Sequence, residues 1–164
     1  MTEQNKYRFY IVENDDLTAK LISRLLDEAG HTAEITADSV MAYDKILERK
    51  PDCVICDLMM PEVDGLNLCK RIRETPELSN IPFIMVSTKA YEFDQNRAFE
   101  FGADGYIRKP VNPQTFVDRV NRILDDHIDM TFWGVRGTLP VTGEQALKYG
   151  GNSSCMSLEF PREQ

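Results

Sequence analysis

The stretch from residue 53 to residue 65 reads CVICDLMMPEVDG. It begins with an unbroken apolar run, passes to an acidic residue, Asp57, and ends in the turn-forming pair Asp64-Gly65. An apolar run without polar alternation is typical of a strand that is buried on both faces, as in a parallel sheet covered by helices. An aspartate at the end of such a strand needs a partner, because burying an unpaired charge costs free energy. The stretch therefore predicts a central strand with a candidate functional acid at its carboxyl end.

The same pattern of an apolar run followed by an amphipathic stretch recurs up to about residue 129. Apolar runs lie at 9–12, 33–35 (the weakest), 53–58, 83–86 and 106–107, and amphipathic stretches cover about 17–29, 41–47, 66–72, 94–101 and 112–124. Gly30 and Gly102 follow two of the amphipathic stretches, where glycine commonly ends a helix. Asn112-Pro113 precedes the last one, as a helix start prefers. The repeats predict an α/β fold, with a five-stranded parallel sheet and helices on both faces.

Length and composition exclude several classes of protein. The 164 residues are enough for one ordinary domain with some residues to spare, and 42% of them are apolar and 28% charged, as in globular proteins. A net charge of −8 argues against nucleic acid as the main partner. No apolar run is long enough to span a membrane, and the first residues, MTEQNKYRFY, do not have the pattern of a secretory signal.

Four cysteines, Cys53, Cys56, Cys69 and Cys155, raise the question of a metal or redox site, because the first two have CxxC spacing. Residues three apart on a strand point to opposite faces of the sheet, so the thiols of Cys53 and Cys56 should diverge. We interpret both as small buried core residues. Free thiols together with the absence of a signal sequence favour a cytoplasmic location.

Polar residues of possible chemical use follow four of the apolar runs. They are Glu13, Asn14, Asp15 and Asp16 after the first, Asp57 after the third, Ser87 and Thr88 after the fourth, and Arg108, Lys109 and Pro110 after the fifth. The carboxyl ends of parallel strands form one edge, which is where open α/β sheets bind ligands. Carboxylates suit Mg²⁺ and can attack a phosphoryl group, while a lysine and a hydroxyl can bind phosphate oxygens. For Asp15 and Asp16, capping of the next helix is the commoner role.

Four ordered segments at these strand ends carry a family resemblance. They read FYIVENDD (9–16), VICDLMMPEVDG (54–65), FIMVSTKA (83–90) and FGADGYIRKP (101–110). Together they resemble the landmark segments of bacterial response-regulator receiver domains, over about residues 5–127. The resemblance implies a flavodoxin-like (βα)5 fold and a role in two-component signal transduction, with a sensor histidine kinase or phosphotransfer protein as the partner.

The resemblance also implies roles for individual residues. Asp57 corresponds to the phosphoacceptor, Lys109 to the lysine and Ser87 to the hydroxyl of the site, and Tyr106 to the aromatic switch residue. The ligands of Mg²⁺ would be Glu13, Asn14, Asp57 and the backbone carbonyl of Met59. A cis peptide bond between Lys109 and Pro110 is expected as well.

Two positions depart from the family pattern. Asn14 stands where receivers usually have an acid that touches the metal directly, so one negative charge is lost and weaker Mg²⁺ binding is expected. Asp15 lies one position away as a candidate replacement. Thr88 stands where the family favours a small residue, which should slow both the arrival and the loss of phosphate.

From Met130 the chain changes character, and helical periodicity ends. Two strand-like pieces are expected near Thr131–Val135 and Ser154–Phe160. FWGVRGTLP followed by YGGNSSC resembles the opening strands of metallo-β-lactamase-fold hydrolases, over about residues 131–159. The metal-binding histidine motif of that family is missing, because the only histidines, His31 and His127, precede this region. We therefore expect a receiver domain at 1–129 and a truncated start of a hydrolase-type output domain at 130–164, without enzymatic activity of its own.

Three interpretations follow. The first is a phosphoaccepting switch that controls a C-terminal output domain. The second is a hydrolase whose active site belongs to a longer parent protein. The third is a receiver that no longer takes phosphate and serves as an interaction module, for which Asn14 is the support. In all three, the apolar tail is expected to need a partner surface, either the receiver itself or a second copy of the chain.

Overall fold

The structure, a computed structural model, describes residues 6–89, 91–125, 129–133 and 155–159. By its internal contacts the chain divides into two compact units, Met1–Asp126 and His127–Gln164. Within the described residues, no helix has the length and apolar character needed to cross a membrane.

The first unit is built on a sheet of five parallel strands. They are β1 (Arg8–Val12), β2 (Thr32–Thr36), β3 (Cys53–Asp57), β4 (Phe83–Ser87) and β5 (Gly105–Arg108), in the order β2-β1-β3-β4-β5. All four pairs of neighbouring strands are parallel. The predicted sheet is therefore confirmed, and so is the flavodoxin-like fold. The strand order changes direction between β1 and β3, and open α/β sheets bind ligands beyond the carboxyl ends of the strands at such a point.

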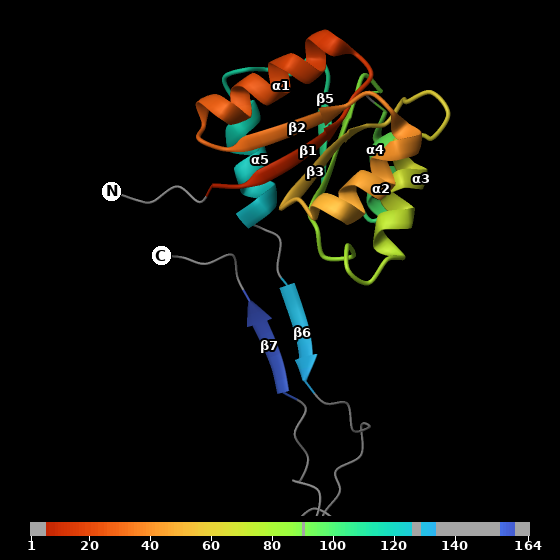
Figure 1. The fold of residues 1–164 in the computed structure, drawn as a ribbon, viewed down its shortest axis with the longest axis vertical. Coiled ribbons are helices and arrows are strands. Elements are labelled where there is room, and N and C mark those ends of the chain that lie inside the picture. Colours follow the sequence, from red (N-terminus) through yellow and green to blue (C-terminus); the bar gives the residue numbers. More distant parts are fainter. Residues whose placement is uncertain (1–5, 90, 126–128, 134–154, 160–164) are drawn as a thin grey trace, which may run out of the picture. The chain divides into compact units, whose positions relative to one another are not determined.

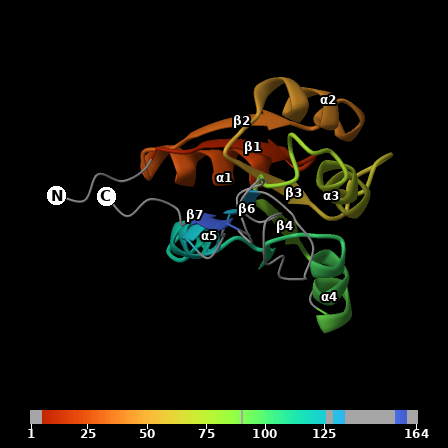
Figure 2. The ribbon, with the colours of Figure 1, turned by 90° about the horizontal axis from the view of Figure 1, so that it is seen from below.

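Five helices cover the two faces of this sheet. They are α1 (Asp16–Glu28), α2 (Ser39–Arg49), α3 (Gly65–Arg73), α4 (Glu92–Glu100) and α5 (Phe116–Asp125). Figure 1 shows α1 and α5 on one side of the sheet and the other three helices together on the opposite side. In Figure 2, α3 lies between α2 and α4.

The strands are buried because each face of the sheet carries its own core. Side chains such as Phe9 and Ile55 pack with apolar residues of α1 and α5. Side chains such as Tyr10 and Val54 pack with residues of α2, α3 and α4. Cys53 belongs to the first core and Cys56 to the second, so the prediction that these thiols diverge is confirmed. Burial raises the pKa of both thiols well above the usual value, which keeps them neutral.

Local sequence signals set most helix boundaries. Asp15, Asp38 and Asp64 each cap a helix by accepting a hydrogen bond from a backbone amide of the first turn. Gly30 and Gly102 have φ values of +87° and +95°, and they follow α1 and α4 as predicted. The prediction for α5 was early by one turn. The Asn112 side chain accepts a hydrogen bond from the Gln114 amide and forms a turn, so the helix begins only at Phe116.

The second unit contains two antiparallel strands, β6 (Asp129–Trp133) and β7 (Cys155–Glu159). Asp129 pairs with Glu159, and Trp133 pairs with Cys155. The expected strand pieces began at Thr131 and Ser154, so β6 starts two residues earlier than predicted. Val135, Ser154 and Phe160 of those pieces lie outside the described residues.

Candidate functional site

Three charged side chains meet at the carboxyl edge of the sheet. Glu13 follows β1, Asp57 ends β3 and Lys109 follows β5. Lys109 Nζ lies 2.8 Å from Glu13 Oε2 and 2.8 Å from Asp57 Oδ2. One ammonium group therefore bridges two carboxylates that come from different strands. The peptide bond between Lys109 and Pro110 is cis, as the family resemblance implied.

These three groups are largely withdrawn from water. The side chains of Glu13, Asp57 and Lys109 are 1%, 8% and 11% exposed. Burial raises the pKa of Glu13, although the nearby ammonium group of Lys109 and the hydrogen bond from the Asp15 amide oppose this effect. Burial alone would lower the pKa of Lys109, but the hydrogen bonds and charges of Asp57 and Glu13 prevail and raise it. Lys109 is therefore held firmly in its charged form.

The loop after β3 is tied to the end of the strand by two hydrogen bonds, one to Asp57 and one to Leu58. The Met59 amide donates a hydrogen bond to Asp57 Oδ1 at 3.0 Å, and the Gly65 amide donates to the Leu58 carbonyl at 3.1 Å. A Cβ atom at position 65 would lie 2.4 Å from the Asp57 carbonyl oxygen, so only glycine fits there. Gly65 is thus required by a close approach to the backbone of the candidate site.

Ser87 and Tyr106 both contact the first residues of the loop between β4 and α4. Ser87 Oγ accepts a hydrogen bond from the Lys89 amide at 3.1 Å, and Tyr106 donates its hydroxyl to the Lys89 carbonyl at 3.0 Å. Val86 is the register partner of Asp57, so Ser87 lies one residue beyond the acid on the neighbouring strand. Burial raises the pKa of Tyr106, while its hydrogen bond with Ser87 opposes the shift. The hydroxyl, the tyrosine and the loop therefore form one connected group.

The acids that follow Glu13 have other partners. Asp15 caps α1 with its carboxylate and donates its own backbone amide to Glu13 Oε1 at 3.0 Å. Asp16 forms an ion pair with Lys20 at 2.6 Å. The capping interpretation of Asp15 is therefore confirmed. Asn14 and Thr88 are both exposed.

The oxygen atoms at this edge suit a hard divalent cation. Glu13 Oε2 is buried and receives no hydrogen bond of good geometry from the described residues; Lys109 at 2.8 Å is its ion-pair partner. Glu13, Asp57, the Asn14 amide and the Met59 carbonyl are all oxygen donors, which Mg²⁺ prefers. Within the same residues, however, no group of three or more His, Cys, Asp and Glu side chains is arranged to hold a metal. These oxygen donors fit the chemistry of Mg²⁺, but only two of them, Glu13 and Asp57, carry a negative charge.

Sequence reasoning missed one residue near this loop. Ser39, the first residue of α2, is buried, and its Oγ donates a hydrogen bond to the Pro61 carbonyl at 2.6 Å. The two residues are 22 positions apart in the chain, and no local pattern connects them. The only available signal was a small hydroxyl residue directly after the capping aspartate Asp38.

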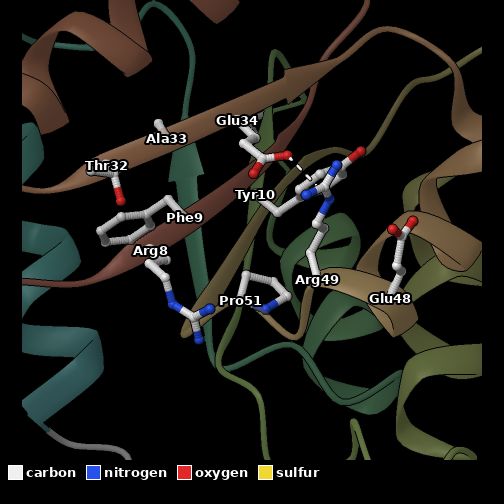
Figure 3. Close-up of a pocket in the computed structure, with 9 residues that line it drawn as sticks. All are labelled: Arg8, Phe9, Tyr10, Thr32, Ala33, Glu34, Glu48, Arg49 and Pro51. Carbon is white, nitrogen blue, oxygen red and sulfur yellow. Dashed lines mark ion pairs between the residues drawn. The ribbon is translucent and has the colours of Figure 1, made fainter.

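A hollow with a volume of ≈ 380 Å³ lies at the opposite edge of the sheet (Figure 3). Residues at the amino-terminal halves of β1 and β2 and at the end of α2 line it. Glu34 and Arg49 form an ion pair across it at 3.8 Å, and Arg8 is held by Asp52 at 3.2 Å. Because these opposite charges pair with each other, the hollow does not offer the concentrated charge found around Lys109.

Comparison with known proteins identifies the family. Residues 9–121 match the model of the response regulator receiver domain. The polar-differentiation response regulator DivK of Brucella anthropi is 33% identical over 116 residues, which are 71% of this chain and 94% of DivK. The transcriptional regulatory protein BaeR of Escherichia coli is 37% identical over 124 residues, which are 74% of this chain but only 50% of BaeR. The chain thus spans about half the length of BaeR.

A solved structure agrees with this assignment. The crystal structure of a putative response regulator from Chloroflexus aurantiacus superposes with a TM-score of 0.69 at 34% sequence identity, and the match covers 73% of this chain and 98% of that one. The residues that match the family model, 9–121, include Glu13, Asp57 and Lys109. The chain therefore belongs to the response regulator receiver domain family.

Proposed function

We propose that this chain accepts a phosphoryl group on Asp57 from a sensor histidine kinase or a phosphotransfer protein, and that the modified receiver switches a C-terminal output domain. The observation that carries the proposal is the position of Asp57, at the end of a buried strand with Lys109 Nζ 2.8 Å from its Oδ2. Membership in the receiver family supports the same interpretation. The cytoplasm, where histidine kinases present their phosphoryl groups, is the proposed location.

In the proposed reaction, an oxygen of the Asp57 carboxylate attacks the phosphorus atom of the donor. The new P–O bond forms while the bond between phosphorus and the donor's nitrogen or oxygen breaks, and the donor leaves with that electron pair. Lys109 and the hydroxyl of Ser87 then bind the phosphoryl oxygens, where negative charge has to be stabilised. Lys109 already faces Asp57, so it needs to shift only from the carboxylate to the new oxygens.

Glu13, Asn14, Asp57 and the Met59 carbonyl are the proposed ligands of Mg²⁺. When bound, Mg²⁺ would neutralise the charge that two carboxylates and a phosphoryl group bring to one place. Asn14 contributes a neutral amide oxygen, so the site holds one negative charge fewer than two adjacent acids would give. Magnesium affinity is therefore proposed to be weak.

Ser87 and Tyr106 are the proposed switch residues. In the described state Ser87 Oγ accepts a hydrogen bond from the Lys89 amide, and Tyr106 donates to the Lys89 carbonyl. A phosphoryl group on Asp57 would compete for the Ser87 hydroxyl, and that would alter the start of the loop to which Tyr106 is bound. A local change in charge would thus reach the surface around α4.

Residues 130–164 are proposed to be the start of an output domain of the metallo-β-lactamase type. The segments FWGVRGTLP and YGGNSSC support this, and so does the antiparallel pairing of β6 with β7. The chain itself is proposed to be no hydrolase, because this segment contains no histidine to bind metal. Cleavage of a phosphodiester by the purified chain with zinc or manganese would contradict that statement.

The test is intact-mass measurement after incubation with acetyl phosphate and Mg²⁺. The wild-type chain should gain the mass of one phosphoryl group, and Asp57→Asn should gain none. A matched control is Asp64→Asn, which removes a carboxylate from the same loop but leaves the acceptor in place. An adduct that persists in Asp57→Asn would refute the assignment. No adduct on the wild-type chain would favour the alternative of a receiver that acts only as an interaction module.

A further inference from the structure

The loop after Asp57 contains a turn that is unfavourable by itself. The Val63 amide donates a hydrogen bond to the Pro61 carbonyl at 2.8 Å, and the central residue, Glu62, has a φ of +68°. This is a three-residue γ-turn whose central residue has a positive φ. Residues other than glycine rarely adopt that backbone conformation. Such backbone persists only where surrounding contacts hold it in place.

One buried hydroxyl holds both ends of this turn. Ser39 Oγ donates to the Pro61 carbonyl at 2.6 Å and accepts from the Val63 amide at 3.3 Å. Ser39 is 4% exposed and is fixed as the first residue of α2, directly after the capping residue Asp38. The exposed side chain of Glu62 has no comparable anchor in the described structure. The clamp is therefore supplied by α2, from outside the loop.

The clamped turn is continuous with the groups around Asp57. Met59 lies two residues before Pro61, and its amide binds Asp57 Oδ1 at 3.0 Å. Gly65 lies two residues after Val63, and it closes the loop on the Leu58 carbonyl at 3.1 Å. A change in the turn reaches Met59 by a short path, because only Met60 separates Met59 from Pro61.

We infer that Ser39 is a positioning residue for phosphorylation: by clamping both ends of the Pro61–Glu62–Val63 turn, it holds the Met59 backbone in the geometry that Asp57 requires. The inference rests on the proposed function of Asp57. Ser39 itself touches neither the donor nor the reacting oxygen. Its effect is to keep the loop organised before the donor arrives.

The test is a double-mutant cycle of Ser39→Ala and Glu62→Gly. Alanine is a good helix former, so α2 should persist without the hydroxyl. Glycine adopts positive φ without strain, so with Gly at position 62 the turn should no longer depend on the clamp. We expect Ser39→Ala to slow phosphorylation by acetyl phosphate about two- to tenfold, the factor that corresponds to a hydrogen bond of ordinary strength. Adding Glu62→Gly should restore the rate to within about twofold of the Glu62→Gly single variant.

Hydrogen exchange of the Val63 amide gives a readout independent of phosphorylation. Exchange should become faster in Ser39→Ala and should be unaffected in Thr75→Ala. The latter is the matched control, because Thr75 Oγ1 bonds the Tyr43 hydroxyl at 2.7 Å and so also connects α2 with the chain after α3, but away from the loop. Thr75→Ala should lower stability while leaving the phosphorylation rate unchanged.

The outcomes separate the two proposals. A wild-type chain that takes no phosphate would refute the function of Asp57, while Val63 exchange would still decide whether the clamp exists. If the wild type is phosphorylated, an unchanged rate in Ser39→Ala would overturn the positioning role. Strict additivity of the two effects on the phosphorylation rate would overturn it too. The loss of rate caused by Ser39→Ala must depend on which residue stands at position 62. If Ser39→Ala alone does not fold, the double variant is compared with Glu62→Gly: equal rates support the inference, and a slower double variant contradicts it.

Discussion

Asn14 is a residue at which the candidate site departs from the pattern that the resemblance to receivers implies. It is exposed and contributes an amide where a carboxylate would add charge, while Asp15 is occupied as the cap of α1. The acid content of the site therefore rests on Glu13 and Asp57, and both of these carboxylates already share Lys109. Any cation that binds here has to compete with an ammonium group for the same oxygens.

This gives a prediction for Asn14→Asp. The added charge should tighten Mg²⁺ binding about two- to tenfold, a modest factor because the position is exposed and screened by solvent. Titration with Mg²⁺ followed by tyrosine fluorescence measures the affinity, and the rate of phosphorylation should rise with it. Asp16→Asn is the control. Asp16 pairs with Lys20, so this substitution should leave the affinity for Mg²⁺ unchanged. Equal affinities of the wild type and Asn14→Asp would show that position 14 is not a ligand.

His31 gives the receiver a dependence on pH that is unrelated to phosphorylation. The ring is buried against Tyr7 and Phe9, with centroid separations of 5.6 and 5.3 Å, and its Nδ1 accepts the Tyr7 amide at 3.4 Å. Burial lowers the pKa of His31. Below the unfolded pKa of about 6.5, the unfolded chain therefore binds more protons at this residue than the folded chain does.

The free energy of unfolding should accordingly fall as the pH drops from about 6.5 towards the folded pKa of His31. Urea denaturation at several pH values, compared between the wild type and His31→Asn, isolates this residue from the other titrating groups. Glu13, whose pKa is raised, contributes in the opposite sense and is common to both proteins. The difference in the free energy of unfolding between the wild type and His31→Asn should shrink with falling pH. A difference that stays constant would contradict the prediction.

At the scale of elements, the apolar runs of the sequence predicted every strand of the sheet. The run at 33–35 was the weakest signal because β2 is an edge strand, with Ile35 43% exposed. Asp57, Lys109 and Glu13 could be predicted to meet because parallel strands end at one edge. Ser39 could not, because its hydrogen bonds with the loop depend on how α2 packs beside α3. Contacts of that kind have no local sequence pattern.

The close packing of α3 against β3 gives a prediction for Gly65→Ala. The new methyl group would lie 2.4 Å from the Asp57 carbonyl oxygen, so the loop has to move, at a cost of about 1–3 kcal/mol in the free energy of unfolding. Phosphorylation should slow because the displaced backbone carries Asp57. Gly30→Ala is the matched control: it places a side chain at a φ of +87° with no atom within 4 Å, so it should lower stability but not the rate. Equal phosphorylation rates in both variants would contradict the prediction.

At the scale of the whole molecule, the receiver holds a complete core of its own. Both core clusters are made of residues between Tyr7 and Leu124. Within the described residues, by contrast, β6 and β7 pair only with each other, and a two-stranded sheet alone is marginally stable in water. Pairing with further strands would therefore stabilise the proposed output segment, and a second copy of the chain can supply them.

Removal of residues 130–164 should leave a folded monomer that is phosphorylated at the wild-type rate, whereas the intact chain should associate. Light scattering over a range of concentrations compares the two proteins, and circular dichroism confirms that the shorter one is folded. An intact chain that stays monomeric throughout would refute self-association. The competing interpretation is that the tail packs on its own receiver, and it predicts that removal of the tail exposes apolar surface to a hydrophobic dye.

The bridge made by Lys109 has a consequence for the stage of synthesis at which the site becomes complete. Glu13 and Asp57 leave the ribosome well before Lys109, which follows the last strand of the sheet. Until that strand has docked, two carboxylates at the edge of the sheet have no ammonium group between them, and their repulsion opposes burial. The proposed acceptor site is therefore completed last, and before its whole sheet is in place a nascent receiver should have no Asp57 that is ready for phosphorylation.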